Sequence, residues 1–333
     1  MQDLIFFIKN KAISLGIDVI GFSSTKKIDD FQKKYYKTTY TPLQYFFPNV
    51  KTVIAAGFSY NFLWNQVSKD TAGYIARYTT ANFYKILSNK LRLLGQEIKN
   101  YLKIQVKDSD FFRIFVNSKI NDKLAAFSSG IGSFSKNSLI SIDNKGQKFV
   151  LGELLLDFEL PYFNEEKKET CYNCDICISK CPTNALEDKF IKKEKCLQHL
   201  TTQLDIPNNK LFIQHWGQRF YGCTDCIDCC PLNKNFIKTN NENLIGFIGT
   251  NFDVTEILSM KKTFYKSTFK NNQLSASWVK EVVLARNGLI SIFNQNKYEL
   301  IKEYIQNLKF FEWDYYEETY LSNFCKLLIE DKI

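Results

Sequence analysis

Residues 171–182 read Cys-Tyr-Asn-Cys-Asp-Ile-Cys-Ile-Ser-Lys-Cys-Pro, and residues 223–231 read Cys-Thr-Asp-Cys-Ile-Asp-Cys-Cys-Pro. The first segment has the spacing C-x2-C-x2-C-x3-C-P, and the second contains C-x2-C-x3-C-P. With Cys196 between them, the two segments hold nine of the ten cysteines of this 333-residue chain. Thiols at such short and regular spacings indicate that this part of the chain binds metal.

The first spacing is that of bacterial ferredoxins, in which three close cysteines hold one [4Fe–4S] cluster and the fourth, before a proline, reaches a second cluster. The same rule applied to both segments assigns four ligands to each of two clusters. The predicted sets are Cys171, Cys174, Cys177 and Cys230 for one cluster, and Cys181, Cys196, Cys223 and Cys226 for the other. Cys229 is left over, and because it adjoins Cys230, it stays open which of the two is the ligand.

Two zinc sites are the alternative, since C-x2-C also forms zinc knuckles, but four thiolates in one short run that ends in Cys-Pro favour interlocked clusters. A disulfide framework is less favoured, because residues 1–16 read as an amphipathic helix and not as a secretory signal. The longest uncharged run, residues 52–68, contains several polar side chains, so we expect no membrane span. We therefore expect a cytoplasmic protein with reduced thiols.

The composition is that of an ordinary globular protein, with 45% hydrophobic and 24% charged residues. The formal net charge of +9 is compatible with a polyanionic partner such as nucleic acid. Because the lysines are dispersed and no long basic block occurs, the charge alone favours a plain solvated surface over such a partner.

Apolar periodicity predicts an α+β protein of three parts. Residues 1–160 form a mixed α/β domain, residues 161–235 a ferredoxin-like double-cluster domain, and residues 236–333 a helical region. The helices expected in the first part span residues 1–15, 72–102 and 123–127, and its strands span residues 18–22, 52–56, 111–116, 138–142 and 149–156. The helices expected in the last part span residues 275–293, 297–308 and 312–328.

The order of these motifs resembles the epoxyqueuosine reductase family, the cobalamin-dependent iron–sulfur enzymes of tRNA queuosine synthesis. Besides the cysteines, the segments that carry the resemblance are Cys196-Leu197-Gln198-His199-Leu200-Thr201, Gly217-Gln218-Arg219-Phe220-Tyr221-Gly222-Cys223, Gly130-Ile131-Gly132 with Lys136-Asn137-Ser138-Leu139, and Leu151-Gly152-Glu153-Leu154-Leu155. The double-cluster pattern alone is shared with other ferredoxin-like proteins, so the upstream turn makes the resemblance specific.

The resemblance implies that cobalamin lies between the N-terminal and cluster domains, and that an external low-potential donor supplies electrons through the two clusters. The substrate would be epoxyqueuosine in a tRNA anticodon loop. The resemblance also implies that Lys136, Gln198, Thr224 and Asp225 bind the cofactor. Lys136 equally fits a solvent-facing turn, and the other three equally fit hydrogen bonds to cluster sulfur.

One position departs from the family. Its Val-Asp-Ser, with the presumed proton donor, is Val116-Asn117-Ser118 here, and an asparagine amide cannot give up a proton at useful pH. Asp122 and Tyr84 are candidate replacement acids, although each also fits a surface or packing role. Three functions therefore follow: an epoxyqueuosine reductase, a corrinoid and iron–sulfur reductase of another substrate, or a non-catalytic electron carrier.

Overall fold

The computed structural model describes residues 2–36, 40–62, 70–160, 165, 171, 174–207, 209–234, 237 and 244–330. The chain forms two compact units, each assembled from three separate segments. Unit 1 comprises Met1–Phe62, Phe83–Cys174 and Pro231–Asn240. Unit 2 comprises Leu63–Asn82, Asp175–Cys230 and Asn241–Ile333. Within the described ranges, no helix is both long and apolar enough to cross a membrane.

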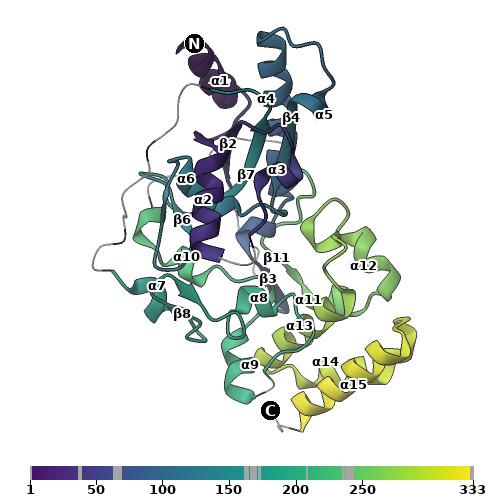
Figure 1. The fold of residues 1–333 in the computed structure, drawn as a ribbon. Coiled ribbons are helices and arrows are strands. Elements are labelled where there is room, and N and C mark those ends of the chain that lie inside the picture. The colour runs from purple at the N-terminus through teal and green to yellow at the C-terminus, as the bar shows by residue number, and fades with distance from the viewer. Residues whose placement is uncertain are drawn as a thin grey trace. The chain divides into compact units, whose positions relative to one another are not determined.

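Unit 1 is built on a four-stranded sheet in which every pairing is antiparallel (Figure 1). Its strands, in spatial order, are β1 (Val19–Ser24), β2 (Thr52–Ser59), β7 (Phe149–Leu156) and β4 (Phe112–Val116). Every residue of β2 is buried, as expected for a central strand that is covered on both faces.

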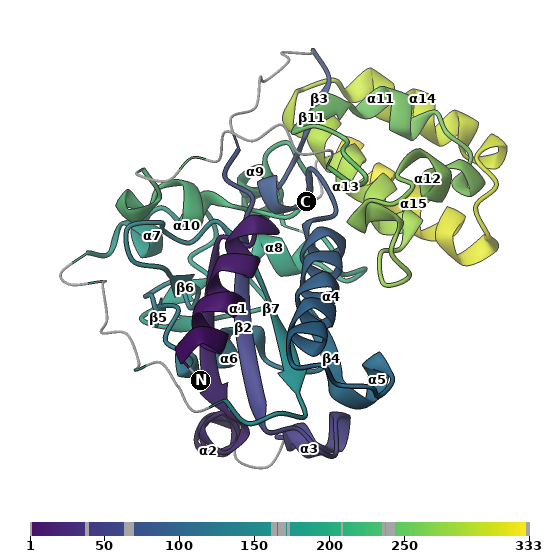
Figure 2. The same ribbon diagram turned by 90° about the horizontal axis from the view of Figure 1, so that it is seen from above.

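Helices cover both faces of this sheet (Figure 2). The helices of unit 1 are α1 (Gln2–Ser14), α2 (Thr25–Tyr36), α3 (Leu43–Phe46), α4 (Phe83–Tyr101), α5 (Asp108–Phe111) and α6 (Asp122–Ser128). Ala55 and Leu155 face Ile28 of α2 and Ala125 of α6 in one core cluster. Phe58 lies on the other face of β2, where its ring packs on Phe83 of α4. Helices α4 and α6 therefore lie on opposite faces of the sheet.

Two short elements complete unit 1. The strands β5 (Ser133–Phe134) and β6 (Ile140–Ser141) form a small hairpin, and the turn η2 is Pro231–Asn233. The side chain of Asn233 accepts a hydrogen bond from the backbone N–H of Gln147 at 2.6 Å, which fixes this returning segment to unit 1.

Unit 2 contains a three-stranded sheet with a helical layer (Figure 1). Its central strand β3 (Ala72–Ile75) pairs in parallel with β10 (Arg219–Tyr221) and antiparallel with β11 (Asn251–Asp253). The elements of the cysteine-rich part are α7 (Ile176–Ser179), β8 (Leu186–Glu187), β9 (Phe190–Ile191), α8 (Leu197–Leu200), α9 (Lys210–Trp216) and α10 (Asp225–Asp228). The remaining elements are η1 (Arg77–Thr79), α11 (Val254–Leu258), α12 (Lys262–Thr268), η3 (Gln273–Ser275), α13 (Glu281–Asn294), α14 (Tyr298–Asn307), η4 (Leu308–Phe310) and α15 (Tyr315–Ile329).

Helix α13 is the centre of unit 2. Every residue from Val282 to Phe293 is buried, including the polar side chains of Arg286 and Asn287. A helix that is buried on all sides lies inside its domain, with other elements packed around it. The resulting α+β architecture, with C-terminal helices, confirms the expected fold class in its broad form.

Several sequence-based elements need correction. The helix expected over residues 72–102 is wrong in its first part, because residues 72–75 form β3 and α4 begins only at Phe83. Gly73 lets this strand pack closely, since a Cβ there would lie 2.4 Å from Cγ2 of Val254. The strand expected over residues 138–142 is reduced to β6. Ser138 has a φ of 61°, which no strand residue adopts. Helix α2 was not expected from the sequence.

Candidate iron–sulfur and cofactor site

Four cysteines of unit 2 act electrostatically on Cys226. Burial raises the pKa of the Cys226 thiol, and the charges of four other cysteines raise it further. These four are Cys223, Cys196, Cys177 and Cys181. The structure thus brings together all four members of one predicted ligand set, with Cys177 beside them.

Short helices position these cysteines. Cys196 is the N-cap of α8, and Cys226 lies in α10, whose N-cap is Thr224. None of the ten cysteines forms a disulfide. Among the described residues, no three His, Cys, Asp or Glu side chains are arranged to hold a single metal ion.

The surroundings of the thiols fit iron–sulfur ligands. The backbone N–H of Ala185 donates to the sulfur of Cys181 at 3.3 Å, a type of contact that tunes cluster thiolates. Burial raises the pKa of the Cys223 thiol to about 11, while the guanidinium of Arg219 lowers it. Because burial disfavours an isolated thiolate, a positively charged iron would offset the burial of these sulfurs.

The other predicted ligand set, Cys171, Cys174, Cys177 and Cys230, stays a prediction. Cys174 belongs to unit 1 and Cys177 to unit 2, because the boundary between the units falls inside the first cysteine segment. The backbone N–H groups of Cys229 and Cys230 both bond to carbonyls of α10. These bonds do not distinguish the two sulfurs, so which of Cys229 and Cys230 is the iron ligand remains a prediction.

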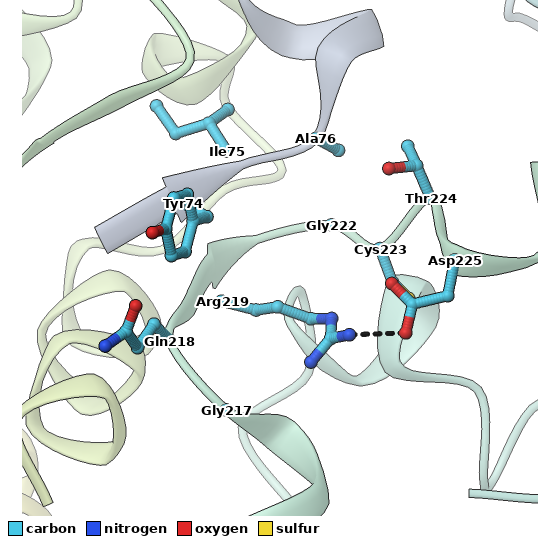
Figure 3. Close-up of a pocket in the computed structure, with 10 residues that line it drawn as sticks. All are labelled: Tyr74, Ile75, Ala76, Gly217, Gln218, Arg219, Gly222, Cys223, Thr224 and Asp225. Atoms are coloured by element: carbon cyan, nitrogen blue, oxygen red, sulfur yellow. Dashed lines mark hydrogen bonds and ion pairs between the residues drawn. The ribbon is translucent and has the colours of Figure 1, made fainter. Parts of the chain in front are cut away.

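A cavity of about 460 Å³ adjoins the gathered thiols within unit 2 (Figure 3). It is lined by Tyr74, Ile75, Ala76, Gly217, Gln218, Arg219, Gly222, Cys223, Thr224 and Asp225. Two of the residues expected to bind cofactor, Thr224 and Asp225, thus share a cavity wall with the predicted ligand Cys223. The hydroxyl of Thr224 donates to Asp228 at 2.5 Å.

Arg219 lines this cavity and is fixed in place by several contacts. Its guanidinium forms an ion pair with Asp225 (Figure 3) and donates to the carbonyls of Trp216 and His215. Sequence reasoning gave no role to Arg219, although it lies in a segment that carries the family resemblance. It brings a positive charge beside the predicted iron ligand Cys223.

Gly222 allows the chain to pass close to Tyr78 just before Cys223. Its φ is 75°, and a Cβ there would lie only 2.3 Å from the Tyr78 hydroxyl. Its backbone N–H donates to the hydroxyl of Thr201 at 2.8 Å. These contacts fix the backbone that presents Cys223.

The other two residues expected to bind cofactor lie elsewhere. Gln198 is exposed on α8 and does not line the cavity. Lys136 is half-buried in the turn between β5 and β6 of unit 1. Their cofactor roles remain predictions.

Asn117 and Asp122 lie together at the end of β4 in unit 1. Asn117 is exposed, with a φ of 47°, and its backbone N–H donates to Oδ2 of Asp122 at 3.0 Å. Burial raises the pKa of Asp122 to about 7. Tyr84 lies in the first turn of α4, on the opposite face of the sheet from α6, so the two candidate acids come from different layers.

Glu153 is a further titratable group that sequence reasoning did not single out. It is fully buried in β7, and burial followed by the charge of Asp122 raises its pKa well above the usual range of a glutamate. The signal in the sequence was a lone carboxyl inside the apolar run of residues 149–156.

Cysteine thiols at ferredoxin spacing, beside a cavity in an α+β fold, define an iron–sulfur protein of the double-cluster class. Residues 170–233 match the family model described as a 4Fe-4S double cluster binding domain. The chain is 30% identical over 258 residues to an epoxyqueuosine reductase from Cyclobacterium marinum. This match covers 71% of this chain and 80% of the relative. The chain belongs to the epoxyqueuosine reductase family, as a divergent member.

Solved structures show the same fold. A structure of epoxyqueuosine reductase from Streptococcus thermophilus superposes with a TM-score of 0.81 at 21% identity, and covers 98% of this chain and 90% of the other. A crystal structure of epoxyqueuosine reductase with an epoxyqueuosine-modified tRNA-Tyr stem loop superposes with a TM-score of 0.75 at 19% identity, over 99% of this chain and 98% of the other.

Proposed function

We propose that the chain is a cobalamin-dependent iron–sulfur reductase that converts epoxyqueuosine to queuosine in a tRNA anticodon loop. The observation that carries the proposal is the group of cysteine thiols around Cys226 with the adjoining cavity, in a member of this family. The substrate is proposed because the similar proteins are epoxyqueuosine reductases, and one of the similar solved structures contains an epoxyqueuosine-modified tRNA stem loop.

We infer that the cavity of unit 2 is part of the cobalamin site, because its volume of about 460 Å³ is that of a small-ligand site. Thr224 and Asp225, which line it, would contact the cofactor, and Lys136 and Gln198 are proposed as further contacts. When bound, cobalamin would supply a reactive cobalt centre at low potential.

The clusters would act as an electron relay. One would bind Cys171, Cys174, Cys177 and Cys230, and the other Cys181, Cys196, Cys223 and Cys226. Reduction of an epoxide to an alkene takes up two electrons and two protons and releases one water. The electrons would come from an external low-potential donor, while the protein must place a proton on the departing oxygen.

Three residues are proposed at the acid position. Asn117 stands where the family aspartate would be, and it can orient the substrate but cannot protonate it. Asp122 is the better acid, because it lies against Asn117 and its pKa is raised to about 7. Tyr84 is the alternative acid from the other face of the sheet. The segment 1–160 would thus provide the substrate chemistry and residues 161–235 the electrons.

The test uses anaerobically reconstituted protein with cobalamin, a strong chemical reductant and tRNA that contains epoxyqueuosine. Nucleosides from the digested tRNA are analysed by mass spectrometry, and we expect queuosine to accumulate. Bound cobalamin without queuosine would indicate a corrinoid reductase of another substrate. Iron–sulfur clusters without any bound cobalamin would indicate an electron carrier.

A further inference from the structure

Glu153 is a carboxyl in the middle of an apolar strand. Its neighbours across the sheet are Ala55 of β2 and Phe115 of β4. The alternation of β7 places it on the face of Leu151 and Leu155, which pack in the core cluster with α2 and α6. Within the described part of the chain, neither of its oxygens receives a hydrogen bond. A buried carboxylate without donors is strongly disfavoured, so this carboxyl keeps its proton.

Asp122 is the partner of this carboxyl. It is the first residue of α6, and the backbone brings it near Glu153. Glu153 pairs with Phe115 of β4, and the N–H of Asn117, two residues further along, donates to Oδ2 of Asp122. The charge of Asp122 and a side-chain hydrogen bond with it both raise the pKa of Glu153. Oδ2 of Asp122 accepts from the N–H of Asn117, whereas Oδ1 is shut off from solvent and has no donor among the described residues. Asp122 as a whole is only half-buried, so the pair has an inner and an outer carboxyl.

We propose that Asp122 and Glu153 form a general-acid pair, in which Glu153 keeps its proton in a hydrogen bond to Asp122 and Asp122 gives its own proton to the leaving oxygen of the substrate. This inference rests on the proposed function, since the leaving oxygen is that of an epoxide. In the step, the O–H bond of Asp122 and a C–O bond of the epoxide break, and a new O–H bond forms on the departing oxygen. The two electrons come from the external donor, and solvent returns the proton to Asp122.

The electrostatics agree with this division of roles. Burial raises the pKa of Asp122 to about 7, while the N–H of Asn117, the hydrogen bond from Glu153 and the charge of Lys123 act in the opposite direction. Burial and the neighbouring Asp122 raise the pKa of Glu153 well above its usual range. The facing strands β2 and β4 contribute Ala55 and Phe115, which are uncharged. An acid whose pKa lies near the working pH is the most effective proton donor.

The test is an infrared titration of the reconstituted protein, which follows the C=O absorption of protonated carboxyls. In the wild type, we expect one acid that stays protonated above neutral pH and a second that titrates near pH 7. Asp122→Asn should remove only the titrating acid, and Glu153→Gln only the persistent one. Glu97→Gln, on the exposed face of α4, is the matched control and should leave both.

The variants also separate a neutral Glu153 from an ionised one. A glutamine amide can replace the donated hydrogen bond, so Glu153→Gln should leave the titration of Asp122 within about one pH unit of the wild type. Glu153→Leu removes the donor and should raise that midpoint. A midpoint that falls by more than about one unit in Glu153→Gln would overturn the proposal, because it would mean that an ionised Glu153 had raised the pKa of Asp122.

Activity distinguishes this inference from the proposed function. Single-turnover formation of queuosine should slow as pH rises through 7, and Asp122→Asn should reduce its rate by about 10²-fold or more. Full activity of Asp122→Asn would refute the acid role. If the wild type forms no queuosine while the infrared titration is as expected, the substrate assignment is wrong and the proton-sharing pair stands.

Discussion

Replacement of Asn287 by leucine should destabilise unit 2 and weaken the cluster site. Asn287 is fully buried in α13, and its amide donates to the carbonyls of Thr201 at 2.9 Å and Phe220 at 2.8 Å. Thr201 is the C-cap of α8, whose N-cap is Cys196, and Phe220 lies in β10 just before Cys223. One side chain thus ties together the two segments that present predicted iron ligands.

The expected loss follows from the two carbonyls. A leucine has a similar shape but no donor, so both buried oxygens lose their partner, at about 1–3 kcal/mol each, or about 2–6 kcal/mol in total. The change also removes the oxygen that accepts from the Arg286 guanidinium at 3.0 and 2.7 Å. Since whole domains are stable by only about 5–15 kcal/mol, the variant should be close to unfolding.

The measurement is the denaturant midpoint of the reconstituted protein, together with its iron content. Asn294→Leu is the matched control on the same helix. Asn294 also donates twice, to Ile213 and Gly217 at 2.8 Å, but it is only partly buried, so water can replace its bonds. If Asn287→Leu unfolds at the wild-type midpoint, or if Asn294→Leu costs as much, burial of these carbonyls does not explain the stability of the site.

Three further outcomes are expected. Cys230→Ser should reduce the iron content from about eight to about four per chain while Cys229→Ser leaves it unchanged, and the reverse pattern would move the ligand by one residue. Asn117→Asp should restore the family's acid and raise single-turnover reduction at equal cofactor occupancy; an unchanged rate would show that this position no longer meets the reacting oxygen. The raised pKa values of Asp122 and Glu153 mean that the native state holds protons which the unfolded state releases, so both groups contribute stability that is fully present below about pH 4. The contribution of Asp122 is lost as pH rises through about 7, and that of Glu153 is lost as pH rises through its own raised pKa. The melting temperature of Glu153→Gln should therefore vary less with pH than that of the wild type, and equal slopes would contradict the assignment.

Local patterns in the sequence predicted the sheet of unit 1 well. Strands β2 and β7 are continuous apolar runs, and such runs report burial directly. The failure at residues 72–82 has a tertiary cause, because Ile75 and Tyr78 fit a helical period while β3 is fixed by pairing with β10 and β11, which are remote in sequence. No local pattern contains that information.

The candidate site was predictable to the extent that chemistry follows spacing. Three of the four cysteines whose charges act on Cys226, namely Cys181, Cys196 and Cys223, belong to the ligand set predicted for it from the cysteine spacing. The fourth, Cys177, is predicted for the other cluster, and both ligand sets stay predictions. Arg219 and Glu153 were missed for a different reason. Each acts through a neighbour, Asp225 in one case and Asp122 in the other, and such pairing becomes visible only when the chain is folded.

The buried polar groups of unit 2 show why the C-terminal helices are needed for the cysteine site. Apolar packing alone would leave the irregular loops between the cysteines free to adopt several arrangements, since their backbone groups have few partners in regular structure. Arg286 donates to the carbonyls of Leu200 and Leu204, and Asn287 to two more in the neighbouring segments. A helix that is distant in sequence therefore satisfies the backbone on both sides of the thiols. Because a buried carbonyl without a donor is disfavoured, these bonds select one loop arrangement, and in that arrangement the charges of Cys196 and Cys223 act on Cys226.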